Sequence, residues 1–227
     1  MSMSFFASWL DSVFAGFDGA VINFMHALAV SAGAVLTPVM KFITLIGEKG
    51  IIVLVLALVL MCFAKTRRVG ICVFGAVCCG ALITSICLKG AVARMRPLEA
   101  SETYQAFWQF VGAPFEDGFS FPSGHVTAVM AGMCALCAAL GKRGKRYIIP
   151  SAVFVLLMGV SRVYLMAHYP SDVVGGILVG ALSAAIAFYI TRLIYKLLEK
   201  YHDNAFCKFV LEFDVRRILN EKRKKIS

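Results

Sequence analysis

The sequence predicts an all-α fold, a polytopic membrane helical bundle with five or six transmembrane helices. Hydrophobic residues make up 60% of the 227 positions, and the mean hydropathy is +0.81. Ordinary soluble domains carry a smaller apolar share. The apolar residues also gather into runs that can cross a hydrocarbon core, which takes roughly 20 residues per helix. One domain is expected, because no internal repeat or linker separates a second one.

Five apolar runs are predicted to cross the membrane as helices. They lie at about 47–64, 69–88, 124–140, 147–165 and 173–195. Residues 20–46 are apolar too, but His26, Thr37 and Pro38 interrupt them, and no flanking charge fixes their orientation. Whether this segment crosses as a sixth helix or lies flat in the interface stays open.

Three segments are expected along the chain. They are an N-terminal apolar or interfacial segment, a transmembrane core and a basic cytoplasmic tail, at residues 1–46, 47–195 and 196–227. Residues 1–19 lack the basic region of a secretory signal, and their charged side chains are Asp11 and Asp18. We therefore expect no cleaved leader.

The basic residues mark the two sides of the membrane. Of the 23 lysines and arginines, 17 fall in clusters at 65–68, 142–146 and 192–225, on one side of the predicted bundle. By the positive-inside rule that side is cytoplasmic. The outer side keeps Lys41, Lys49, Lys89, Arg94, Arg96 and Arg162. Because the net charge of +10 is placed in this way, no nucleic-acid partner is expected. The tail suits either an interfacial helix or a solvated segment.

Three polar clusters interrupt the apolar sequence on the outer side. The first reads KGAVARMRP, from Lys89 to Pro97. If the preceding helix continues, Lys89 and Arg96 are about two turns apart, so both cations would share one face. Pro97 favours ending the helix there. Arg94 points elsewhere and is expected at the membrane interface. Cations that snorkel to the headgroups are the alternative explanation.

The second cluster is Pro122, Ser123, Gly124 and His125, where a predicted helix begins. The free N–H groups of a first helical turn favour an anion such as phosphate. Gly124 lets the backbone approach a ligand closely, Ser123 adds a hydroxyl donor, and His125 can supply a proton. Taken alone, these residues would suit an ordinary helix cap.

The third cluster reads SRVYLMAHYPSD and holds Arg162, His168 and Asp172. Arg162 is expected at the end of one helix, with Pro170 and Ser171 as the first-turn proline and cap of the next. Asp172 then lies close to His168. A carboxylate bonded to one imidazole nitrogen leaves the other free to attack, as in a catalytic triad. A surface pair without a role is the alternative.

Together these residues suit phosphoryl transfer. They offer cations and N–H donors for the phosphoryl oxygens, a nucleophile with an orienting group, and an acid. No metal or other cofactor is expected, because Lys89, Arg96 and Arg162 can neutralise the charge. The other outer acids lack the paired spacing that a magnesium site prefers; they are Glu99, Glu102, Glu116 and Asp117.

At these residues the chain resembles the type 2 phosphatidic acid phosphatase superfamily, which is related to vanadium-dependent haloperoxidases. The resemblance covers roughly residues 40–195. The first family motif is a lysine followed, after six residues, by Arg-Pro, and it matches Lys89, Arg96 and Pro97. The second motif, Pro-Ser-Gly-His, matches residues 122–125. The third motif is Ser-Arg, then a His after five residues and an Asp after three more. It matches Ser161, Arg162, His168 and Asp172.

The resemblance implies a metal-independent membrane lipid phosphatase with its site at the outer face. It makes His168 the nucleophile that forms a phosphohistidine, with Asp172 orienting it and His125 protonating the leaving oxygen. Water then releases phosphate. The phosphoryl group would be held by Lys89, Arg96, Ser123, Gly124 and Arg162. The expected partners are a lipid phosphate and the bilayer, and the oligomeric state is left open.

Polyprenyl diphosphate, such as undecaprenyl diphosphate, is slightly favoured as the substrate. Three cations suit a highly charged headgroup, and a compact chain suits an envelope-recycling enzyme. Phosphatidic acid or phosphatidylglycerophosphate is the alternative. The aromatic-rich loop at 98–121 would anchor at the interface or cover a lipid chain.

Two other classes of protein are weighed. Haloperoxidases share the cradle but are soluble. A non-catalytic phospholipid-binding or transport protein would lack a nucleophile or acid, and a transporter would place its polar groups near mid-membrane.

Overall fold

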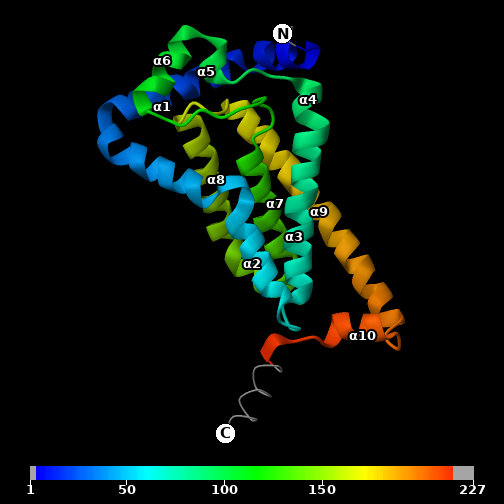
Figure 1. Ribbon diagram of the computed structural model, residues 1–227. Coiled ribbons are helices and arrows are strands. Elements are labelled where there is room, and N and C mark those ends of the chain that lie inside the picture. The colour runs from blue at the N-terminus through cyan, green and yellow to red at the C-terminus, as the bar shows by residue number, and fades with distance from the viewer. Residues whose placement is uncertain (1–3, 217–227) are drawn as a thin grey trace.

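The chain is helical throughout most of the part that the structure describes, residues 4–216 (Figure 1). This computed structural model confirms the all-α fold class, with no strand among those residues. Its α-helices are α1 (Phe5–Ile46), α2 (Ile51–Met61), α3 (Arg67–Leu82), α4 (Lys89–Val92), α5 (Pro97–Ala100), α6 (Glu102–Val111), α7 (Gly124–Ala139), α8 (Ile148–Tyr164), α9 (Pro170–Lys200) and α10 (Ala205–Glu212). Outside the described residues lie five basic residues of the predicted tail, Arg217, Lys222, Arg223, Lys224 and Lys225.

Helices α3, α7 and α9 form the centre of the bundle. Small residues let them approach closely, as is usual for helices that pack within a membrane. A Cβ on Gly176 would lie 2.8 Å from the Ser123 carbonyl oxygen, and one on Gly180 would lie 2.8 Å from that of Thr127. The start of α9 therefore lies against the start of α7. The Ser123 N–H donates to the Asp172 carbonyl oxygen across this contact, at 3.1 Å.

Helix α1 runs across the upper end of the bundle in Figure 1 and then turns toward α2. The Ser4 hydroxyl caps it by accepting from the Ala7 N–H at 3.1 Å. Non-helical backbone at Ala32 (φ −136°) bends the helix. Its main contacts are with α8, and it also touches α9. The segment at 20–46, whose path the sequence left open, is thus part of a bent helix at this end.

Four helical stretches are long and apolar enough to cross a membrane by length and composition. They are Phe5–Met61, Arg67–Ala100, Gly141–Tyr164 and Pro170–Lys200, and α7 is a shorter apolar helix. The predicted crossings at 69–88 and 173–195 fall within two of these stretches, that at 147–165 overlaps a third, and that at 124–140 corresponds to α7. The predicted crossing at 47–64 covers only the C-terminal end of the first stretch. The α-helix within it is α2, which has 11 residues.

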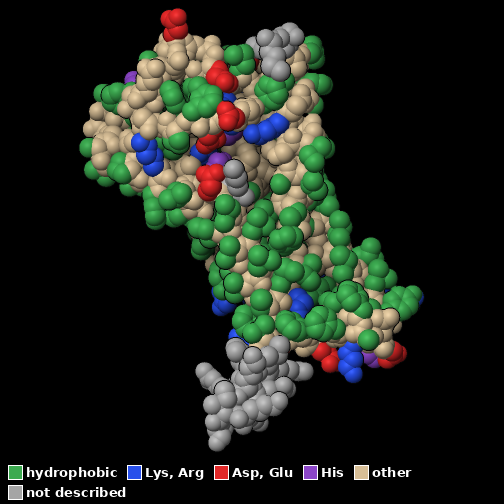
Figure 2. Space-filling model, viewed as in Figure 1, with side chains coloured by type: hydrophobic (Ala, Val, Ile, Leu, Met, Phe, Trp, Pro, Cys, Tyr) green, Lys and Arg blue, Asp and Glu red, His purple; other side chains and the backbone are tan. Residues whose placement is uncertain are grey.

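Side-chain type changes along the axis of the bundle (Figure 2). Hydrophobic side chains cover the shaft in this view, while charged and histidine side chains gather at the upper end and again at the lower end. Leu56, Leu156 and Leu178 are among the exposed apolar residues of the described part. Because charged groups are costly in hydrocarbon, the shaft is the part that suits a bilayer.

The second predicted crossing does not continue as one regular helix to Arg96. A π-helical turn at Ile83–Leu88 joins α3 to α4, and α4 ends at left-handed Ala93 (φ 51°). Arg96 is instead the N-cap of α5, which begins with Pro97. The expectation that Lys89 and Arg96 share a helical face is therefore wrong, because the backbone turns between them.

The lower end of the bundle holds a buried arginine. Arg67 donates from Nε to the Met61 carbonyl at 2.9 Å and from Nη1 to the Val210 carbonyl at 2.6 Å, and its Nη2 contacts the Phe213 carbonyl. Arg67 therefore ties α10 to the turn before α3. Helix α9 runs on to Lys200, past the predicted start of the tail, so the tail begins as helix.

If the lower end faces the cytoplasm, an impermeant thiol reagent should label Glu102→Cys from outside and Lys142→Cys only after permeabilisation. Both positions are exposed. Gly144 is unsuited, because a Cβ there would lie 1.9 Å from the Cys137 carbonyl oxygen. Labelling of the unsubstituted chain, with its eight cysteines, provides the baseline. The reverse pattern would overturn this orientation.

Candidate active site

A cavity of about 600 Å³ lies at the upper end of the bundle. Five of the eight predicted site residues line it: Lys89, Arg96, Gly124, His125 and His168. The other three are buried next to residues that line it: Ser123, Arg162 and Asp172. The structure therefore brings all three sequence clusters to one place.

The start of α7 offers donors to an anion. Ser123 is the N-cap, so the N–H groups of the first turn lack helical partners. Its Oγ is buried without a hydrogen-bond partner among residues 4–216. A Cβ on Gly124 would meet no atom of another residue within 4 Å, so the space over this turn is open. A helix N-terminus of this kind suits a phosphate-like anion.

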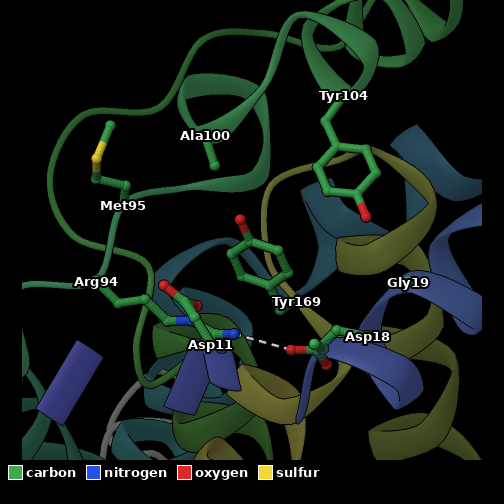
Figure 3. Close-up of a pocket in the computed structure, with 9 residues that line it drawn as sticks. Asp11, Asp18, Gly19, Arg94, Met95, Ala100, Tyr104 and Tyr169 are labelled. Atoms are coloured by element: carbon green, nitrogen blue, oxygen red, sulfur yellow. Dashed lines mark hydrogen bonds and ion pairs between the residues drawn. The ribbon is translucent and has the colours of Figure 1, made fainter. Parts of the chain in front are cut away.

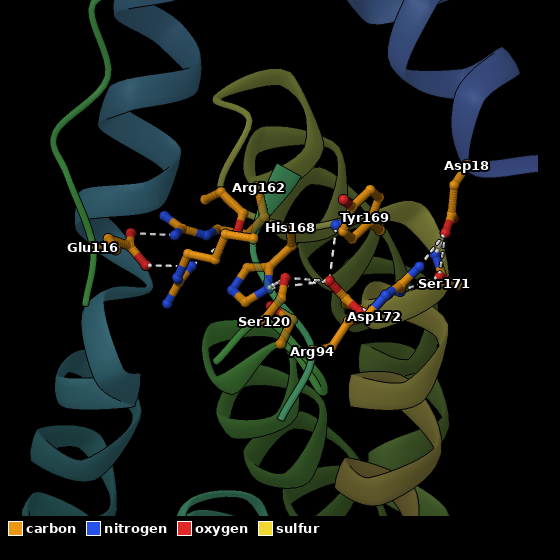
Figure 4. Close-up of polar contacts among 12 residues, drawn as sticks. Asp18, Arg94, Glu116, Ser120, Arg162, His168, Tyr169, Ser171 and Asp172 are labelled. Carbon is orange, nitrogen blue, oxygen red and sulfur yellow. Dashed lines mark hydrogen bonds and ion pairs between the residues drawn. The ribbon is translucent and has the colours of Figure 1, made fainter. Parts of the chain in front are cut away.

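His168 lies in the connection between α8 and α9, with its ring facing Ser120 and Asp172 (Figure 4). Its Nδ1 is 3.4 Å from Ser120 Oγ and 3.7 Å from Asp172 Oδ2. The Ser120 hydroxyl donates to the same Asp172 oxygen at 2.5 Å, and the Tyr169 N–H donates to it at 2.9 Å. This arrangement favours a proton on Nδ1 and leaves Nε2 as the basic nitrogen.

Burial keeps the His168 imidazole neutral. Because burial disfavours the charged ring, it outweighs the raising effect of Asp172, and with a further contribution from Arg162 it lowers the pKa of His168 to about 4. At pH 7 the ring is therefore in the uncharged form, which is the nucleophilic one.

Tyr169 rather than Ser171 caps α9. Its backbone is extended (φ −73°, ψ 153°), and Pro170 is the first helical residue. Asp172, the third, reaches back to the Tyr169 N–H as the acidic member of a capping box. The predicted cap at Ser171 is wrong by two residues. The same capping bond fixes the Asp172 side chain toward His168.

Glu116 connects two of the predicted phosphate-binding arginines. Its Oε2 is 3.3 Å from Arg96 Nη1, and its Oε1 contacts Arg162 Nη2. Arg162 Nε is buried without a hydrogen-bond partner in the described part of the chain. Arg96 also donates to the Ala167 and Gly118 carbonyls at 2.8 and 2.9 Å. A carboxylate thus lies between two guanidinium groups, a place that suits any oxyanion.

The Glu116 carboxylate stays ionised. Burial alone would raise the pKa of Glu116, but Arg162, followed by smaller effects of His125 and Arg96, lowers it to about 2. The bridge is therefore complete at neutral pH and weakens only as the pH falls toward 2.

Glu48 and Ser120 are contacts that sequence reasoning missed. Glu48 Oε2 lies 3.3 Å from His125 Nε2, although the two residues are 77 positions apart. Ser120 is 52 positions from Asp172. No local spacing could have paired them, since the fold alone brings them together.

Arg94 was expected at the membrane interface, and the structure contradicts this. Its side chain is 1% exposed and bonds to Asp11, Asp18 and Asp172 at 2.8, 2.8 and 2.7 Å. It also lies over the Tyr169 ring, 4.0 Å from the centroid. A cation buried so deeply needs carboxylate partners, and α1 supplies two of them.

No group of three or more metal-ligating side chains in residues 4–216 is arranged to hold a metal ion.

The three polar clusters lie inside a region with a known family pattern. The pattern of the PAP2 superfamily matches residues 69–196, more than half of the chain. The chain belongs to the PAP2 superfamily. This confirms the family that the three signatures indicated. Helices α1 and α2 lie outside the matched residues of this PAP2 chain.

The chain is similar to proteins of several organisms. It is 38% identical to the lipid A 1-phosphatase of Rhizobium johnstonii over 116 residues, which are 48% of the chain and 44% of the relative. It is 30% identical to the undecaprenyl-diphosphatase of Sulfolobus acidocaldarius over 149 residues, 65% of the chain and 67% of the relative. The chain thus spans less than half the length of the Rhizobium protein.

A PAP2 structure shares the fold. The crystal structure of a transmembrane PAP2 type phosphatidylglycerolphosphate phosphatase from Bacillus subtilis matches with a TM-score of 0.63. The match covers 86% of the chain and 93% of the Bacillus protein, at 23% identity. With its apolar helices and this transmembrane fold, the PAP2 chain is a multi-pass membrane protein.

Glu116→Gln should bind inorganic phosphate more tightly than the unsubstituted chain, because the anion no longer competes with a carboxylate for Arg96 and Arg162. We expect roughly a tenfold lower Kd, which corresponds to about 1.4 kcal/mol. Calorimetric titration in detergent measures it, with exposed Glu102→Gln as the matched control. Unchanged or weaker phosphate binding would mean that Glu116 instead holds the two arginines in place.

Proposed function

We propose that the chain hydrolyses a lipid phosphate or diphosphate through a phosphohistidine at His168. The observation that carries this proposal is a buried, neutral imidazole, positioned beside Asp172, on a cavity that Lys89, Arg96 and His125 also line. The family and the names of the relatives support the same class of reaction.

In the first step Nε2 of His168 attacks the terminal phosphorus. A P–N bond forms, the bond from this phosphorus to the oxygen of the leaving group breaks, and His125 gives its proton to that oxygen. The leaving group is the lipid alcohol for a monophosphate and the lipid monophosphate for a diphosphate. The ring gains positive charge, which Asp172 stabilises from the Nδ1 side.

In the second step water attacks the phosphorus of the phosphohistidine. The P–N bond breaks, His125 takes the proton of the water, and His168 returns to its neutral state. Inorganic phosphate then leaves, so both histidines regain their starting protonation.

The charge of the phosphoryl group is met by fixed protein groups. Lys89 and Arg96 line the cavity, and Ser123 and Gly124 add donors from the start of α7. Arg162 joins them when Glu116 gives way to the substrate oxygens. Donors fixed in advance stabilise charge that develops in the transition state, so this mechanism requires no metal ion.

The substrate is a lipid of the outer leaflet, with polyprenyl diphosphate ahead of phosphatidic acid and phosphatidylglycerophosphate. The site lies at the end of the bundle opposite α10 and the basic connections (Figure 1), which the positive-inside rule makes the outer end. Three cations near one cavity suit a diphosphate. Phe115 also lines this cavity and is 55% exposed, so it can contact a lipid chain.

Phosphate release from the three lipids, at matched surface concentration in detergent and with excess chelator, tests the proposed function. We expect release from polyprenyl diphosphate at least as fast as from phosphatidic acid, because the cations replace a metal. Dependence on added magnesium would contradict the metal-free mechanism. Lipid transfer between vesicles without phosphate release would place the chain in the non-catalytic class.

His168→Ala should abolish turnover and the covalent phosphoenzyme, because it removes the nucleophile. His125→Ala should lose roughly 10²–10⁴-fold in kcat, yet still form phosphoenzyme from a substrate with a good leaving group. A phosphate-release assay measures kcat. Incubation with a substrate whose phosphoryl group is radioactive, followed by an alkaline quench, measures the phosphoenzyme of each variant. Exposed His202→Ala serves as the control. Equal labelling of His168→Ala and the unsubstituted chain would sink the assignment.

A further inference from the structure

Helix α1 presents two carboxylates on its inner stripe. Ala7, Ile22 and Ala29 are buried, and Asp11 and Asp18 continue the same stripe at helical spacings of four and seven residues. Asp18 is 3% exposed, whereas the Asp11 side chain is 38% exposed. A carboxylate is retained in such a buried position only with strong partners. Both residues lie outside the region that the PAP2 pattern matches.

Asp18 accepts three hydrogen bonds. Its Oδ1 accepts from the Ser171 N–H at 2.8 Å, and its Oδ2 accepts from the Ser171 hydroxyl at 2.6 Å. The same Oδ2 lies 2.8 Å from Arg94 Nη2. A dashed line marks this interaction in Figure 3. One buried carboxylate thus fixes both the first turn of α9 and the Arg94 guanidinium.

Arg94 passes this constraint to Asp172. Its Nη1 donates to Asp172 Oδ1 and to the Ser171 hydroxyl, both at 2.7 Å. Arg94 holds Oδ1 while the Tyr169 N–H holds Oδ2, so Oδ2 is the oxygen that faces His168 Nδ1 (Figure 4). The network from Asp18 to His168 therefore consists of direct contacts, the longest being the 3.7 Å between Asp172 and His168.

We propose that Asp18 is a positioning residue for the site: through Arg94 and Ser171 it fixes the Asp172 carboxylate so that Oδ2 faces His168 Nδ1. The inference rests on the proposed function for the role of His168. Asp18 itself touches neither the nucleophile nor the cavity that holds it. Without Asp18, Nη2 of the buried Arg94 loses its carboxylate partner. The guanidinium then shifts and moves the Asp172 carboxylate out of its present rotamer.

Asp18→Ala should lower kcat by roughly 100-fold with little change in KM, because a displacement of about 1 Å costs about that much while the phosphate-binding groups are untouched. Asp11→Ala is the matched comparison, since it removes a partly exposed carboxylate from the same guanidinium, and its kcat should fall less. An equal loss in both variants, or a change confined to KM, would overturn the proposal.

A second cavity makes chemical rescue an additional test. It measures about 330 Å³ and is lined by both α1 aspartates, Arg94, Tyr104 and Tyr169 (Figure 3). Because Asp11 is partly exposed there, small solutes can enter. Added formate should restore part of the kcat of Asp18→Ala and leave the unsubstituted chain unchanged, as expected for a missing carboxylate that acts on its neighbours. No rescue in a folded Asp18→Ala protein would count against the inference.

Two further measurements keep the inference testable. If Asp18→Ala does not fold, Ser171→Ala removes one link of the network and should lower kcat in the same KM-independent way; unchanged kcat there would overturn it. Nitrogen-15 spectra of the four histidines, with His168 assigned by its loss in His168→Gln, should show a shifted His168 Nδ1 in the Asp18 variant. Identical spectra would also overturn it. This readout needs no turnover, so failure of the proposed function stays distinguishable.

Discussion

The ion pair between Arg94 and Asp172 joins two segments of the site that are 78 positions apart in the sequence. Arg94 lies in the irregular stretch after α4, Asp172 lies in the first turn of α9, and both are almost fully buried. Removing one partner of such a pair leaves an uncompensated buried charge, which costs about 3–5 kcal/mol. The pair therefore constrains where α9 begins, and with it the placement of His168 and the contact between α9 and α7.

Compensation of buried charge recurs through the rest of the site. Arg96 and Arg162 share Glu116, and His125 faces Glu48. These cations are buried at the end of an apolar bundle, where an unpaired charge costs much free energy. They therefore need carboxylate partners within the protein. The internal carboxylates neutralise these cations, so in the proposed reaction the phosphoryl group would take the place of a carboxylate beside Arg96 and Arg162.

The residues that sequence reasoning found are those at helix ends and in short, fixed spacings. Ser123, Gly124 and His125 come together because they form one helical turn, and His168 with Asp172 because a capping box sets their approach. The family match covers these residues. A helical extrapolation failed for Arg94, since left-handed Ala93 was not foreseeable from the sequence.

Long-range partners could not be predicted, because nothing local links α1 or the turn at Glu48 to the polar clusters. A signal for α1 was nonetheless present: Asp11 and Asp18 stand seven residues apart within an apolar run, so they share one helical face. Acidic residues on an apolar face call for a buried cation. Which cation it would be depended on how the chain folds back, which pattern alone does not specify.

Gly176 and Gly180 bring α9 against α7 by lacking a side chain. Any of the other nineteen amino acids adds a Cβ only 2.8 Å from a neighbouring carbonyl oxygen, so the backbone would have to shift. Substitution is therefore restricted at two positions that carry no functional group. We expect substitutions at these two glycines to inactivate the protein as substitutions at the histidines would. Their effect would be steric, since the glycines take no part in any bond that is made or broken.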